Sequence, residues 1–138
     1  MSESFVVVVD PYFSHLVARL KAEGRKLIAV FSDYALAGAA SGIYSVDAGQ
    51  FEAVYHVDSD TSLDGVVKEL AQRPISTVVN GFDTGCSLWV KLCNALGFPH
   101  RPAAELSHVL GNKYRTGNHI RGKGIVVAKS VLVTSANA

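Results

Sequence analysis

The sequence has little of several features that would define its class at once. Its net charge is only +1 over 138 residues, so the chain has no general electrostatic attraction for nucleic acid. No apolar run approaches the roughly 18–20 residues that a membrane-spanning helix needs. The chain starts MSESFVVVVDP, which has no basic region and places an aspartate and a proline directly after a short apolar run. This start is not typical of a signal peptide. These absences argue against nucleic acid or a membrane as the main partner.

Cysteine is also scarce. Cys86 and Cys93 are the only two in the chain, and they lie seven residues apart in one predicted helix, a separation of about 10 Å that no disulfide spans. Neither these cysteines nor the histidines show the spacing of metal ligands. We therefore expect no metal site, and a reduced, cytoplasmic setting.

The sequence does contain a repeated order of strands and helices. The apolar runs at 5–9 and 26–31 predict buried strands, and residues 51–57 and 75–79 are expected to form a third and a fourth strand. Apolar residues at helical spacing predict helices that end at Gly24, at 71 and at 96, with a loop and a short helix in 32–50. This order predicts an α/β fold over residues 1–98, with a doubly wound, mainly parallel four-stranded sheet flanked by helices, as in Rossmann-like domains.

Polar residues between the predicted strands and helices are suited to start the helices. Asp10 precedes Pro11, the typical order of an N-cap and a first helical residue. Thr61 and Ser62 are expected to start the second helix in the same way.

The loop 80–85, with the sequence NGFDTG, follows the fourth predicted strand. Ligands of open α/β sheets bind beyond the carboxyl ends of the strands, and helix N-termini at that edge suit a carboxylate or a phosphate. The glycines of the loop allow close approach of its backbone. Asp10, Gly81, Asp83 and Thr84 are therefore the candidate substrate-binding residues, although Asp83 and Thr84 are equally suited to cap the helix that follows.

The common catalytic and nucleotide-binding motifs are missing. The chain has no GxGxxG after its first predicted strand, no GxxxxGK[ST] and no GxSxG. No catalytic residue is assigned.

The chain changes character after residue 98. Residues 99–111 are expected to form a loop with one helical turn, 112–122 a helix, and 125–133 a strand. The segment 113–123 is locally basic, with Lys113, Arg115, Arg121 and Lys123. A single lysine is ordinarily a solvated surface residue, so Lys113 gains a role only from its context.

That context is a series of motifs in order. An acidic turn between two glycines at 81–85 is followed by a helix, an Ala-Leu-Gly-Phe-Pro step at 95–99, the pair Asn112-Lys113, and Gly-Lys-Gly-Ile at 122–125. The stretch 81–125 resembles the end of the pre-ATP-grasp domain of ATP-grasp ligases, above all the carboxylate–amine (L-amino-acid) ligases. Asn112 stands where that family has aspartate, and the helix after it is rich in poor helix formers.

The resemblance implies an enzyme that uses ATP and Mg²⁺ to join a small carboxylate or amino acid to an amine through an acyl phosphate. Lys113 would reach the ATP phosphates, as a flexible point charge suited to them. Residues 99–138 would form a linker and the start of the ATP-grasp region, and the chain's main partner would be its own ATP-grasp domain. Most ATP ligands and the Mg²⁺ ligands belong to that domain, so we expect the 138 residues to be inactive alone. A homodimer is also compatible with the sequence.

Two alternatives stay open. One is a stand-alone signalling module resembling a response-regulator receiver, because Asp10 and Asp58 follow the first and third predicted strands. Against it, the first strand lacks a pair of acidic residues and the fourth lacks a following lysine. The other is a domain that binds a small molecule or a protein without catalysis.

Overall fold

The structure is a computed structural model that describes residues 4–34, 45–99, 101–129, 131 and 133. Its centre is a four-stranded parallel sheet with the strand order β3-β2-β1-β4. The strands are β1 (Phe5–Val9), β2 (Lys26–Ser32), β3 (Ala53–Val57) and β4 (Ile75–Asn80). All four predicted strands are therefore confirmed, with β3 beginning two residues later than expected.

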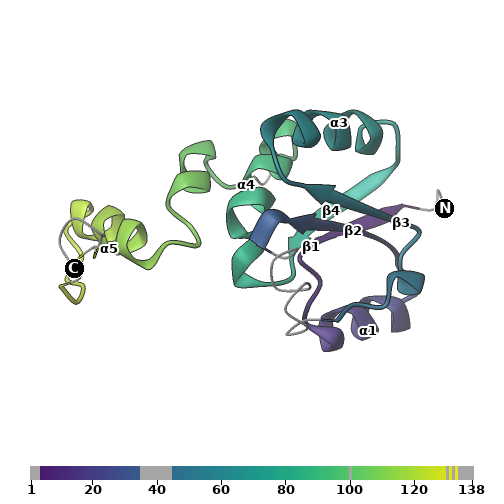
Figure 1. The fold of residues 1–138 in the computed structure, drawn as a ribbon, viewed down its shortest axis with the longest axis horizontal. Coiled ribbons are helices and arrows are strands. Elements are labelled where there is room, and N and C mark those ends of the chain that lie inside the picture. Colours follow the sequence, from purple (N-terminus) through teal and green to yellow (C-terminus); the bar gives the residue numbers. More distant parts are fainter. Residues whose placement is uncertain (1–3, 35–44, 100, 130, 132, 134–138) are drawn as a thin grey trace.

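Helices cover both faces of the sheet (Figure 1). Helix α1 (Ser14–Ala22) lies on one face, and α3 (Asp60–Leu70) and α4 (Cys86–Ala95) lie on the other. Crossovers between parallel strands are right-handed, so crossovers that run in opposite directions along the sheet put their helices on opposite faces. The step from β1 to β2 and the step from β3 to β4 run in opposite directions. The predicted doubly wound, Rossmann-like α/β fold is confirmed.

The core explains why β1 is apolar throughout. Val7 and Val9 pack with Leu70 and Leu92 on the face covered by α3 and α4. Val6 and Val8 pack with residues of α1 on the opposite face. Because successive side chains of a strand point to opposite faces, a strand covered on both sides needs an unbroken apolar run.

The helix starts differ from those expected. Helix α1 begins at Ser14, after Phe13, with no side-chain cap, so the prediction that Asp10 caps it is wrong. The backbone of Asp10 has φ 48°, and its carboxylate turns into the protein. Helix α3 is capped by Ser59 in a reciprocal capping box with Ser62, not by Thr61, because the helix starts earlier than expected.

Short helical segments join the larger elements. Segment η1 (Ala48–Gln50) is the only regular element in the described part of 45–52 and agrees with the short helix expected in 32–50; residues 35–44 lie outside the described residues. Segment η2 (Asp83–Gly85) leads into α4, and neither η2 nor α4 has a side-chain cap. The alternative that Asp83 or Thr84 caps the helix is therefore wrong, because the Thr84 hydroxyl bonds elsewhere.

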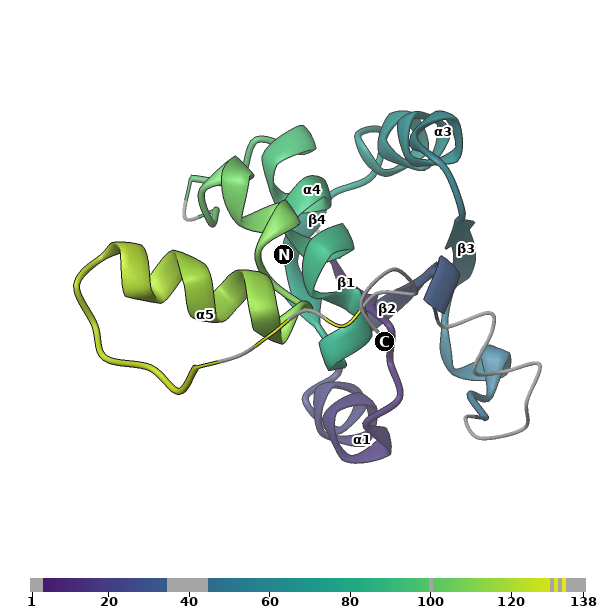
Figure 2. The same ribbon diagram turned by 60° about the vertical axis from the view of Figure 1, so that its left-hand side comes forward.

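The chain after α4 first packs on the sheet domain and then leaves it. Segment η3 (Ala104–His108) lies against α4, and Asn94 Nδ2 donates to the carbonyl oxygen of Pro102 at 2.8 Å. Helix α5 (Lys113–Gly122) follows, as predicted, and buries none of its residues. It points away from the sheet in Figure 1, and Figure 2 shows its first turn beside the sheet domain and the rest of the helix projecting outward.

The strand predicted at 125–133 is wrong for the described part of that segment. Residues 125–129, 131 and 133 belong to no strand. A strand requires a neighbouring strand for its backbone hydrogen bonds, and no described strand lies beside the described part of 125–133. The side chains of Ile125, Val126, Val131 and Val133 are exposed.

The two cysteines are free thiols, as expected from their separation in one helix. Cys93 is buried and Cys86 is half-buried, and burial raises the pKa of both thiols. Among the described residues, no helix is both long enough and apolar enough to cross a membrane.

Candidate functional site

Asp10 joins three segments at the carboxyl edge of the sheet. It is fully buried, and its Oδ1 accepts a hydrogen bond from the backbone N–H of Ser32 at 2.8 Å. Its Oδ2 accepts from the hydroxyls of Ser32 at 2.7 Å and Thr84 at 2.6 Å. A buried carboxylate is tolerated only when donors surround it. Asp10 therefore ties the end of β1 to the end of β2 and to η2.

The glycines of the loop 80–85 permit this arrangement. A Cβ on Gly81 would lie 2.8 Å from the carbonyl oxygen of Asp10 and 2.9 Å from that of Val9, and the Gly81 N–H donates to the Val9 oxygen at 2.7 Å. A Cβ on Gly85 would lie 2.8 Å from Val9 Cγ1. The sequence predicts that these glycines allow a close approach of the backbone. In the structure, the segment that lies close to them is the end of β1.

Two neighbouring clefts open at this edge. The first, the β2–β3 cleft, has a volume of about 350 Å³ and lies beyond the ends of β2 and β3; its polar lining includes Ser32, Asp33, Asp58, Thr84, Ser87 and Lys91. The second, the η3–α5 cleft, has a volume of about 420 Å³; its lining includes Asp83, Ser107, His108, Asn112 and Arg115. Tyr34, Thr84 and Ser87 line both clefts.

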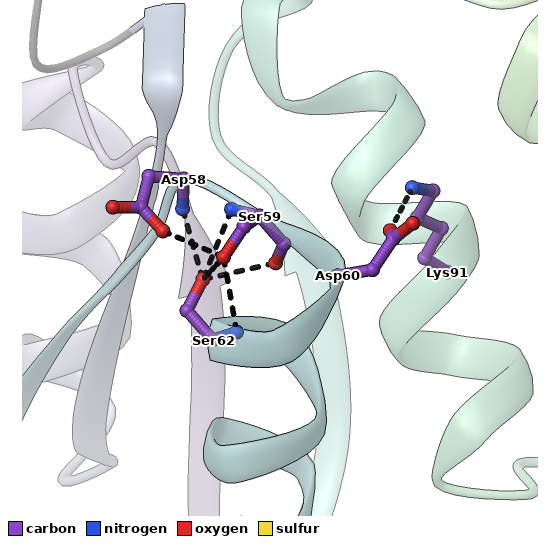
Figure 3. Close-up of polar contacts among 5 residues, drawn as sticks. All are labelled: Asp58, Ser59, Asp60, Ser62 and Lys91. Carbon is purple, nitrogen blue, oxygen red and sulfur yellow. Dashed lines mark hydrogen bonds and ion pairs between the residues drawn. The ribbon is translucent and has the colours of Figure 1, made fainter.

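The β2–β3 cleft has an acidic rim. Asp58 and Asp60 surround the start of α3, and Lys91 of α4 reaches Asp60, with Nζ 3.0 Å from Oδ1 (Figure 3). This ion pair is exposed and contributes little to stability. Lys91 is the only lysine or arginine among the described residues that line the cleft, so no positive side chain is left there to pair with Asp33 or Asp58.

Asp58 is part of the hydrogen-bond cluster that starts α3. Ser59 Oγ donates to Asp58 Oδ1 at 3.0 Å, and the backbone N–H of Asp58 donates to Ser62 Oγ at 3.1 Å (Figure 3). The hydroxyls of Ser62 and then of Ser59 hold the pKa of the Asp58 carboxyl below its ordinary value. Asp58 therefore stays charged to lower pH than a free aspartate.

We expect Ser62→Ala to raise the pKa of Asp58 toward its ordinary value of 3.8. A lowered carboxyl pKa stabilises the fold above the unfolded-state pKa, and this contribution is lost as the pH falls through the folded-state value. The measurement is the pH dependence of the Asp58 side-chain ¹³C resonance. Thr61→Ala, also in the first turn of α3, is the control and should leave the midpoint unchanged. Equal midpoints in Ser62→Ala and the unchanged protein would contradict this account.

The η3–α5 cleft lies between the loop before α4 and the start of α5. Gly111, with φ 85°, lies beside the carbonyl oxygen of Asp83. Asn112 accepts a hydrogen bond from the N–H of Arg115 at 3.0 Å, and the Arg115 guanidinium donates to the oxygen of His108 at 3.3 Å. These bonds hold a cationic side chain at the rim of the cleft.

The residues that the sequence suggests for binding substrate and ATP therefore lie at different places relative to the two clefts. Thr84 lines both clefts and Asp83 lines the η3–α5 cleft. Asp10 is buried beneath Thr84, and Gly81 is buried against the end of β1. Lys113 is exposed in the first turn of α5, outside the lining of both clefts, whereas its neighbours Asn112 and Arg115 line one.

Sequence reasoning missed the contribution of α4. Ser87 and Lys91 of α4 line the β2–β3 cleft beside Thr84 of η2, and their spacing of four residues is that of one helix face. This spacing is visible in the sequence and predicts which side of α4 faces the cleft.

The fold and its clefts define the class: a Rossmann-like α/β domain with two adjoining clefts at the carboxyl edge of its sheet. Within the described residues, no three His, Cys, Asp or Glu side chains are grouped to hold a metal ion. Comparison with known proteins found no matching family model, no matching curated protein and no matching solved structure.

Proposed function

We propose that this chain is the N-terminal domain of an ATP-grasp carboxylate–amine ligase that acts on a small carboxylate or amino acid. The observation that carries the proposal is the η3–α5 cleft. It places the loop 80–85 opposite the start of the basic helix α5, and these two segments carry most of the resemblance to the pre-ATP-grasp domain.

The reaction makes and then breaks an acyl phosphate. The substrate carboxylate attacks the γ-phosphorus of ATP and releases ADP; the amine then attacks the acyl carbon, loses a proton and displaces phosphate. In this proposal Lys113 holds the ATP phosphates as a mobile point charge. Arg115, one turn along the cleft-facing side of α5 from Asn112, adds to the positive field.

Magnesium would neutralise the charge of the phosphates when bound. The described acidic residues do not form a group that can hold a metal ion, so the proposal assigns the Mg²⁺ ligands to the ATP-grasp domain. Asp83 and Thr84, at the edge of the η3–α5 cleft, would contact the amine substrate from the opposite wall.

The surface around α5 supports a partner domain. Helix α5 buries none of its residues, and Val126 and Val131 beyond it are 97% and 81% exposed. Exposed apolar side chains that follow a helix with no buried residue leave apolar surface that a partner domain can cover. In this proposal the ATP-grasp domain covers the surface around α5. The complete enzyme consumes ATP, so we expect it in the cytoplasm.

The proposal predicts a specific effect of Lys113→Ala. In the chain together with its ATP-grasp domain, phosphate release from MgATP should depend on added L-amino acids. Losing one charge-assisted contact to the phosphates should raise the KM for ATP about tenfold or more. Lys123→Ala, at the other end of the same basic helix, is the matched control and should change the KM less than about twofold.

Two results would contradict the proposal. One is the absence of phosphate release with any L-amino acid, although ATP and Mg²⁺ are saturating. The other is an equal change in the KM for ATP in Lys113→Ala and Lys123→Ala. That result would mean that α5 acts through its overall positive charge and that Lys113 makes no specific contact with ATP.

A further inference from the structure

The hydroxyl of Ser32 is fixed by the buried carboxylate beneath it. Ser32 is only 7% exposed, yet it lines the β2–β3 cleft. Its single hydroxyl proton is donated to Asp10 Oδ2. A hydroxyl has one donor and two acceptor positions, and among the described residues nothing donates to Ser32 Oγ. The oxygen is therefore a nearly buried acceptor with unused lone pairs at the cleft.

Thr84 is fixed in the same way. Its hydroxyl donates to the same Asp10 oxygen at 2.6 Å, so only its lone pairs remain for a ligand in the cleft. Asp10 thus orients hydroxyls from two separate segments, β2 and η2, as acceptors. A phosphate or a carboxylate, which also only accepts, would find no donor at either hydroxyl.

The charges on the cleft favour the same kind of ligand. The Asp33 side chain has no hydrogen bond or ion pair with the rest of the described chain, and its carboxylate is an acceptor. In Asp58 one carboxylate oxygen takes the Ser59 hydroxyl, while the other points away from the cluster (Figure 3). The side chains of Leu63 and Leu88 supply an apolar surface between these groups.

We propose that the β2–β3 cleft binds the protonated amino group of an amine substrate. The ammonium protons are donated to Ser32 Oγ and Thr84 Oγ1, Asp33 and Asp58 balance its charge, and its aliphatic part lies against Leu63 and Leu88. That this amine, after losing one ammonium proton to the solvent at the open cleft, is the nucleophile of the ligase rests on the proposed function. The recognition of an ammonium group rests on the hydrogen bonds of Asp10 and on the carboxylates and apolar side chains that line the cleft.

The test is a titration of the ¹⁵N-labelled 138-residue chain with n-butylammonium, followed by ¹H–¹⁵N NMR. Butyrate, of similar size and opposite charge, is the control ligand. Saturable shifts of the Ser32, Thr84 and Leu88 amides are expected with butylammonium and not with butyrate. No saturable shift with butylammonium, or equal shifts with both ligands, would overturn the proposal.

Two variants separate binding from folding. Asp33→Asn changes an exposed side chain with no described partner, so the fold should persist while the affinity for butylammonium falls about fivefold or more. Thr84→Val should weaken binding about tenfold, and Thr84→Ser should restore it. Unchanged affinity in Asp33→Asn would overturn the assigned site.

The two proposals fail separately. Butylammonium binding without phosphate release by the complete enzyme would leave an amine-binding cleft and reject the ligase. Phosphate release without an effect of butylammonium on the β2–β3 cleft would retain the ligase and place its amine elsewhere.

Discussion

Asp10→Ala is expected to lower the free energy of unfolding by about 3–5 kcal/mol. The substitution removes the acceptor of three hydrogen bonds and leaves the buried donors of Ser32 and the half-buried hydroxyl of Thr84 without a partner. Unsatisfied buried donors carry the full cost of their lost hydration. Urea unfolding, followed by the fluorescence of Trp89, measures the effect, since this indole packs against the core and donates to the Val78 oxygen.

Asp33→Ala is the matched control for this prediction. Asp33 is an exposed aspartate at the same edge of the sheet, so its removal should change stability by less than about 0.5 kcal/mol. If Asp10→Ala unfolded at the same urea concentration as Asp33→Ala, the buried carboxylate would not be the junction described above.

Gly81→Ala is expected to destabilise the fold by about 3 kcal/mol or more. The new methyl group would meet two backbone oxygens, those of Asp10 at 2.8 Å and Val9 at 2.9 Å. Backbone at the end of a central strand cannot move aside as a flexible side chain does, so the β1–β4 junction itself must open. The same urea measurement tests it.

Gly65→Ala should have the opposite sign. Gly65 lies inside α3, and nothing lies within 4 Å of the position where its Cβ would be. Alanine is favoured over glycine in a helix by up to about 1 kcal/mol, so this variant should be more stable than the unchanged protein. Destabilisation of equal size in both variants would rule out the close approach at Gly81 as the cause.

The strands were predictable because burial on both faces leaves a local pattern. The unbroken apolar run of β1 requires only that the sheet be covered on both sides, and each run can be read without its neighbours. The same holds for α5, whose N-cap Asn112 accepts a bond from Arg115 three residues away. Local order of this kind is visible in the sequence.

The orientation of Asp10 was not predictable from the residues beside it. An aspartate followed by proline after a strand is suited both to cap a helix and to turn inward. The choice depends on Ser32 and Thr84, which lie 22 and 74 residues further along the chain. The segment 125–133 shows the same limit, because its apolar composition suits a strand but a strand also needs a neighbour.

The central proposal is that this domain forms one wall of an ATP-grasp ligase, and the coding sequence after codon 138 tests it most directly. We expect the reading frame to continue into a domain with a second lysine for ATP, a glycine-rich loop and acidic Mg²⁺ ligands. A stop codon directly after Ala138 would contradict the ligase and leave the β2–β3 cleft as the site of a stand-alone binding domain.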